Sequence, residues 1–128
     1  MSPAREATVT EAAVTGAAVN EAAGTKAAVT AVGVGLPLGK RVIVQDVSFT
    51  AHHGEVLCIA GRNGAGKTTL LRAIAGLGPF TGQLHVQGVS ASAPAHLRAR
   101  EVAYVPQRSS LSAALPVARV VEQGRHVY

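Results

Sequence analysis

The segment that most constrains the fold of this chain is the glycine-rich stretch at residues 61–68, which reads GRNGAGKT. It matches the pattern G-x-x-x-x-G-K-[S/T] in full. The run before it, at residues 55–60, is apolar after its first residue, and this predicts a strand buried on both faces. The run after it, at residues 69–77, has helical apolar spacing and is followed by Gly78 and Pro79. Strand, glycine loop and helix in this order predict an α/β fold of the P-loop class.

The residue types in this loop suit the binding of nucleotide phosphates. Glycines allow a tight turn and let backbone N–H groups approach phosphate oxygens, and the helix that follows adds unpaired N–H donors. A lysine offers its charge to the β- and γ-phosphates, and the next hydroxyl suits Mg²⁺. A chance Gly-Lys-Thr in a turn is the alternative, which the flanking runs disfavour. The predicted nucleotide-binding residues are Gly61, Arg62, Asn63, Gly64, Ala65, Gly66, Lys67, Thr68 and Thr69.

Composition limits the other classes of function. The chain has 128 residues, enough for one domain, and its 48% of hydrophobic residues includes only two Phe, two Tyr and no Trp. The net charge is +5, but the basic residues are scattered and lack aromatic partners, so we expect no nucleic-acid partner. Cys58, the single cysteine, lies in the predicted buried strand, and we expect it to be a core thiol in a reducing compartment.

The first 26 residues differ in composition from the rest. They form loose pentads rich in Ala, Thr and Val, a period that fits neither a helix face nor a strand face. Residues 1–26 are therefore expected to be a disordered low-complexity leader, and residues 27–128 the folded domain; a small repeat module is the alternative for the leader. No secretory or membrane segment is predicted, since the longest uncharged stretch, residues 27–39, is too short to span a bilayer.

Within the folded part, periodicity and turn residues predict further elements. Turns are expected at Gly39-Lys40 and at residues 52–54, which makes His52 and His53 turn residues and not metal ligands. Strands are predicted at residues 27–34, 41–49, 83–87 and 101–105, and helices at residues 95–100 and 116–124.

Several segments, taken in order, resemble the ATP-binding subunits of ABC transporters. Residues 61–77 resemble their Walker A segment, and the sequence Val-Ala-Tyr-Val-Pro-Gln at residues 102–107 resembles their Q-loop. Residues 47–56 are similar to the family's lead-in hairpin, and residues 81–88 to its next strand and turn. The resemblance covers residues 27–128.

This resemblance implies an ATPase that uses ATP and Mg²⁺. Gln107 would act as the catalytic Q-loop residue and, with Thr68, would serve the metal. The implied partners are a transmembrane permease, a second ATP-binding subunit and a periplasmic or lipoprotein substrate-binding protein, with the subunit cytoplasmic and peripheral on the inner face of the membrane. Residues 115–126 are similar to a pattern in importers of iron-siderophore, haem and cobalamin, although Val127 stands where that pattern has proline; a generic surface helix is the alternative.

The chain also departs from the family. No signature motif and no apolar strand ending in Asp-Glu follows Gln107, and the chain contains one aspartate, Asp46, before the loop. We therefore expect an incomplete P-loop fold, the N-terminal half of an ATP-binding subunit, that does not hydrolyse ATP alone. The family's adenine-stacking aromatic is missing, and only Leu36 or Leu38 is available for apolar packing. The alternatives are another P-loop NTPase or kinase, and a non-catalytic or non-functional fragment.

Overall fold

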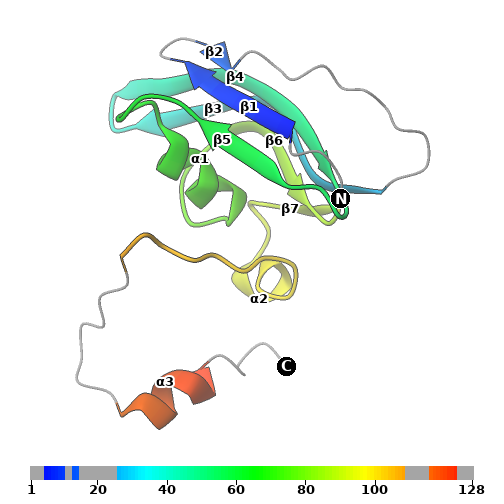
Figure 1. Ribbon diagram of the computed structural model, residues 1–128, viewed down its shortest axis with the longest axis vertical. Coiled ribbons are helices and arrows are strands. Elements are labelled where there is room, and N and C mark those ends of the chain that lie inside the picture. Colours follow the sequence, from blue (N-terminus) through cyan, green and yellow to red (C-terminus); the bar gives the residue numbers. More distant parts are fainter. Residues whose placement is uncertain (1–4, 11–12, 15–25, 109–115, 124–128) are drawn as a thin grey trace.

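Two strands of twelve residues each, β3 (Ala27–Leu38) and β4 (Arg41–His52), form the main hairpin of the chain (Figure 1). The computed structural model describes residues 5–10, 13–14, 26–108 and 116–123. The predicted turn at Gly39 and Lys40 is confirmed, and both strands extend beyond their predicted ends. His52 is therefore the last residue of β4 and not a turn residue. It is buried, and its Nδ1 lies 3.2 Å from Glu55 Oε2.

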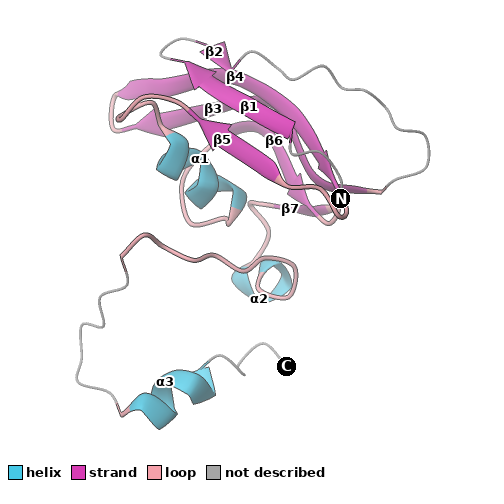
Figure 2. Ribbon diagram, viewed as in Figure 1, coloured by secondary structure: helices cyan, strands magenta, loops and turns pink. Residues whose placement is uncertain are grey.

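The hairpin belongs to an antiparallel sheet of four strands in the order β4-β3-β6-β7. β6 (Thr81–Val86) pairs with β3, and β7 (Val89–Ser90) pairs with β6. The predicted strand at residues 83–87 corresponds to β6, whereas the short β7 was not predicted. Figure 2 shows that strands make up most of this part of the chain and that the helices are short.

The hydrophobic core lies between this sheet and the helix α1 (Lys67–Ile74). Aliphatic side chains fill most of it, together with Phe49. Leu70 and Ala73 of α1 are buried, but Leu77 is 52% exposed because the helix ends at Ile74, before the predicted end. The residues with the most deeply buried large side chains are Val34, Leu36, Val47, Leu70 and Leu84.

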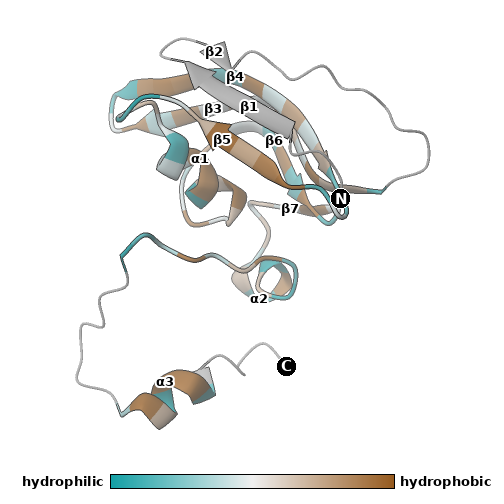
Figure 3. Ribbon diagram, viewed as in Figure 1, coloured by the Kyte–Doolittle hydropathy of each residue, from teal (hydrophilic) through white to brown (hydrophobic). Residues whose placement is uncertain are grey.

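The strand that precedes the glycine loop, β5 (Leu57–Ala60), is not buried on both faces. Leu57 and Ile59 pack against the core, whereas Cys58 is exposed, because successive side chains of a strand point to opposite faces. The prediction of a buried Cys58 thiol is thus wrong. Figure 3 shows β5 as a continuous hydrophobic ribbon, which is why its sequence indicated full burial.

β5 belongs to a second sheet, of order β2-β1-β5. β1 (Arg5–Thr10) runs parallel to β5, and β2 (Ala13–Val14) is antiparallel to β1. Both strands fall within the leader, so at these eight residues the structure differs from the expected disorder. The physical reason is that the edge of β5 presents unpaired N–H and C=O groups, which the Val- and Thr-containing β1 satisfies.

After β7 the chain forms two further helices. α2 (Ala95–Arg98) and α3 (Val117–Gln123) lie within the predicted helices, and α2 is the shorter of the two. No strand forms at residues 101–105, where one was predicted: the segment is extended but has no neighbouring strand among the described residues. The sequence pattern of residues 101–105 is that of a strand, but the pattern does not show whether a neighbouring strand is available for pairing.

The described residues contain neither a membrane-spanning helix nor a metal-binding cluster. None of their helices has the length and apolarity needed to cross a membrane. They also contain no cluster of three or more His, Cys, Asp or Glu side chains arranged to hold a metal ion.

Candidate nucleotide-phosphate site

The glycine loop connects the end of β5 to the first residue of α1, as predicted. Gly64 and Gly66 both have positive φ, +83° and +90°, in the region that favours glycine. A Cβ added at Gly66 would lie 2.6 Å from Val44 Cγ2, whereas one at Gly64 would meet nothing within 4 Å. Gly66 is therefore required by packing as well as by backbone conformation, and Gly64 by backbone conformation alone.

Lys67 is the first residue of α1, and its side chain folds back over the loop. Its Nζ donates hydrogen bonds to the carbonyl oxygens of Gly61 and Arg62, each at 2.7 Å. The loop itself is closed by the N–H of Ala65, which donates to the carbonyl oxygen of Arg62 at 3.2 Å. These bonds hold the ammonium group at the mouth of the loop, where the positive end of α1 also lies.

An open cavity of about 510 Å³ lies in front of the loop. Six of the predicted loop residues line it, together with Gln107, which the chain path brings back from beyond α2. Gly61, Arg62 and Ala65 do not line it; the first two contribute the carbonyl groups that hold Lys67. The lining residues are Leu38, Ile43, Asn63, Gly64, Gly66, Lys67, Thr68, Thr69 and Gln107.

Two apolar residues of the β3–β4 hairpin complete the cavity. Leu38 lines it and is 64% exposed, whereas Leu36, the other predicted candidate, is completely buried in the core. Ile43, on the facing strand, was missed by sequence reasoning. The register of the hairpin shifts between the Pro37–Val42 and Leu36–Val44 pairs and leaves Ile43 without a residue opposite it, so the alternation of β4 gave no signal for its position.

The charge of the cavity is positive. Among the described residues that line it, Lys67 is the only charged one, and no carboxylate is present. The remaining polar groups are the Thr68 and Thr69 hydroxyls and the Asn63 and Gln107 amides. Hydroxyl and amide oxygens are hard donors of the kind that Mg²⁺ accepts, so Thr68 and Gln107 fit a metal that also takes oxygens from phosphate. The arrangement suits a polyphosphate anion and its cation.

Comparison with known proteins gives a family. The family model described as "ABC transporter" matches residues 44–127. The hemin import ATP-binding protein of Gloeobacter violaceus is 42% identical over 97 residues, which are 74% of this chain and 35% of that protein. The cobalamin import ATP-binding protein of Halobacterium salinarum is 41% identical over 96 residues, 73% of this chain and 24% of that protein.

A third relative is the "Probable siderophore transport system ATP-binding protein" of Bacillus subtilis, 37% identical over 97 residues, which are 74% of this chain and 35% of that protein. The chain thus spans about a third or less of the length of these relatives. No solved structure matches it. Because the family model covers well over half of the residues and includes both the loop and Gln107, the chain belongs to the ABC transporter family.

Proposed function

We propose that this chain binds Mg-ATP in the cavity in front of the glycine loop, as the ATP-binding part of an ABC import system. The observation that carries this proposal is the position of Lys67. Its ammonium group is fixed over the loop by two backbone carbonyls and is the only charged group among the described residues of the cavity. A cavity with one fixed cation, loop N–H groups and a helix N-terminus favours an anion with several phosphates.

Each loop residue then has a defined role. Gly64 and Gly66 let the backbone approach the phosphates, Lys67 binds the β- and γ-phosphates, and Thr69 contributes a further hydroxyl. Thr68 and Gln107 would hold Mg²⁺, which would neutralise phosphate charge when bound. As a ligand of the metal, Gln107 would also be the catalytic residue that this chain contributes. Leu38 and Ile43 give the nucleoside an apolar contact in place of an aromatic side chain.

The transported substrate belongs to the same proposal. Two of the relatives are named for import of hemin and cobalamin and the third for siderophore transport, and this supports an iron-siderophore or haem importer. In such a system the chain would act on the inner face of the membrane as a peripheral subunit. It would pair with a second ATP-binding subunit, drive a transmembrane permease and receive substrate through a substrate-binding protein. The segment at residues 115–126, whose pattern suggested this group, lies partly outside the described residues.

We further propose that the 128-residue chain binds ATP without steady hydrolysis. Turnover needs a carboxylate that orients and deprotonates water. The carboxylates whose side chains the structure describes, those of Asp46, Glu55, Glu101 and Glu122, all lie outside the cavity lining, and Glu55 is bonded to His52. Phosphate release that disappears in Lys67→Ala would contradict this, and Glu101 and Glu122 would then be the first bases to test.

Calorimetric titration of the chain with Mg-ATP tests the proposed site. Lys67→Ala removes a charge-assisted contact of about 1.5–3 kcal/mol, a loss of about tenfold to 150-fold in affinity. Lys26→Ala is the matched control, because Lys26 is exposed and precedes β3 at the end away from the hairpin turn. Equal affinities of the wild type and Lys67→Ala would show that the loop is not the site. Stronger binding of Mg-GTP than of Mg-ATP would contradict ATP as the nucleotide of this site.

A further inference from the structure

The C-terminal end of α1 connects the loop to the segment that carries Gln107. α1 ends in a Schellman motif: the N–H of Leu77 donates to the carbonyl of Arg72 at 2.7 Å, and that of Gly76 to the carbonyl of Ala73 at 2.8 Å. Gly76 has the positive φ, +67°, that this motif needs. The carbonyl of Ala75 is not part of the motif, and it takes its hydrogen bond from another element.

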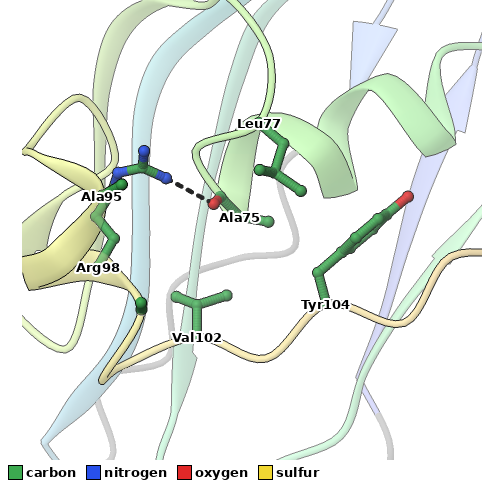
Figure 4. Close-up of a pocket in the computed structure, with 7 residues that line it drawn as sticks. Ala75, Leu77, Ala95, Arg98, Val102 and Tyr104 are labelled. Carbon is green, nitrogen blue, oxygen red and sulfur yellow. Dashed lines mark hydrogen bonds between the residues drawn. The ribbon is translucent and has the colours of Figure 1, made fainter. Parts of the chain in front are cut away.

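That donor is Arg98, the last residue of α2 (Figure 4). Its Nη1 donates to Ala75 O at 2.9 Å, and its Nε donates to Ala93 O at 2.6 Å. The guanidinium therefore joins the end of α1 to the loop before α2, across 23 residues of sequence. The guanidinium lies directly against Gly76, where an added Cβ would overlap Nη1. A cation at a helix C-terminus is also favourable for the helix dipole.

The backbone of Arg98 directs the chain that follows. Its carbonyl accepts hydrogen bonds from the N–H groups of Glu101, at 2.9 Å, and Val102, at 3.1 Å, and so ends α2 and turns the chain. The segment that follows then passes beside the end of α1. Figure 4 shows the Val102 side chain pointing toward Ala75, whereas the Tyr104 ring extends to one side, and Ala75, Leu77, Val102 and Tyr104 share the lining of a cavity of about 230 Å³.

We propose that Arg98 is a positioning residue for Gln107. Through its bonds to Ala75 and Ala93 it fixes residues 102–107 against the P-loop helix, and so it holds Gln107 at the cavity that Lys67 and Thr68 line. The proposal rests on the proposed function, because it assigns Gln107 to bound Mg-ATP. Arg98 lies outside the glycine loop and does not line the cavity in front of it. It acts through the C-terminal end of α1, the helix that follows the loop.

A residue that merely stabilises the fold would behave differently from a positioning residue. Loss of general stability lowers affinity for every form of the nucleotide, and it adds to the effect of removing Gln107. Loss of positioning lowers only the part of the affinity that depends on Mg²⁺, and it has no further effect once Gln107 is gone. Two nucleotide conditions and one double-mutant cycle therefore separate the two roles.

The experiment titrates the full chain with ATP plus Mg²⁺ and with ATP plus EDTA, for the wild type, Arg98→Ala, Gln107→Ala and the double variant. Arg98→Ala is expected to lose about two- to tenfold in affinity with Mg²⁺, with little change in EDTA, and the double variant should bind like Gln107→Ala. Arg98→Lys keeps the charge but cannot bridge both carbonyls, so we expect partial rescue. Arg100→Ala, an exposed arginine two residues further on, should bind like the wild type.

Equal losses in both conditions, or additive losses in the double variant, would overturn the proposal. A wild type that does not bind Mg-ATP, or that binds it as well as Lys67→Ala does, would refute the proposed function instead. The positioning of the segment has its own test without nucleotide: Arg98→Ala and Arg98→Lys should both speed amide hydrogen exchange at Glu101 and Val102, whose N–H groups bond to the Arg98 carbonyl, while the core strands stay protected. Unchanged exchange at these two amides would overturn the role of Arg98 even if both variants weakened binding.

Discussion

The loop at residues 61–69 and the segment at residues 102–107 meet at one cavity but are held in different ways. The loop is shaped by contiguous residues, with positive φ at Gly64 and Gly66 and with Lys67 bonded to carbonyls five and six residues back. The second segment has no strand or helix of its own and reaches the cavity through a contact between Arg98 and Ala75. One half of the site is therefore local in sequence, whereas the other depends on tertiary structure.

The largest expected effect concerns the packing of the local half. Gly66→Ala adds backbone strain of about 1–2 kcal/mol and an overlap with Val44 of about 1–3 kcal/mol, so it should destabilise the chain by about 2–5 kcal/mol. Gly64→Ala has similar strain but open space around the new Cβ, and should cost only about 1–2 kcal/mol. Urea denaturation followed by circular dichroism measures both free energies of unfolding.

Mg-ATP binding by the folded Gly64→Ala variant sharpens the same contrast. The new methyl group would project where the backbone approaches phosphate, so affinity should fall although the fold survives. Equal unfolding free energies for the two alanine variants would show that the contact of Gly66 with β4 does not constrain the loop.

The second half of the site should show a smaller effect. Gln107→Ala removes a neutral amide, whose hydrogen bonds contribute about 0.5–1.5 kcal/mol, so Mg-ATP affinity should drop about two- to thirteenfold. In a full-length subunit the same change should reduce turnover more than binding, because positioning of water matters most in the transition state. Steady-state kinetics and calorimetry measure the two quantities. A fall in affinity as steep as the fall in turnover would make Gln107 an ordinary binding contact.

The smallest effect is expected at the apolar edge of the cavity. Leu38→Ala should weaken ATP binding by about 0.5–1 kcal/mol, about two- to fivefold, through lost contact with the nucleoside. Binding of inorganic triphosphate should not change, since Leu38 comes from the hairpin and not from the loop. Val42→Ala provides the control, because Val42 is on the same hairpin, is 51% exposed and does not line the cavity. A loss of triphosphate affinity in Leu38→Ala would indicate a change in the hairpin itself.

The local half of the fold could be predicted from the sequence for physical reasons. A glycine loop, a lysine at the helix start and a turn at Gly39 and Lys40 are fixed by interactions within a few residues. The hairpin strands, the order of β5, loop and α1, and the later short helices followed from the same kind of signal. The P-loop class of the fold and the ABC transporter family were also predicted correctly.

The errors fall where distant segments decide the outcome. Burial of Cys58 depended on what covers β5, and the extended form of residues 101–105 depended on whether a strand lies next to them. The end of α1 at Ile74 is the exception, because it follows from the Schellman motif at Gly76, a local stop signal that the apolar spacing of residues 69–77 did not reveal. Ile43 was missed because its place beside the loop is set by packing of the hairpin and not by any motif.

The most direct test of the central claim is amide NMR of the isotope-labelled chain, with ATP in EDTA and then with Mg²⁺ added. We expect the N–H signals of residues 61–69 to shift in both conditions, because the local half binds phosphate. The side-chain amide of Gln107 should shift only when Mg²⁺ is present, because the second half senses the metal. Shifts confined to residues outside 61–69, or a Gln107 side-chain amide signal that does not change when Mg²⁺ is added, would contradict the account.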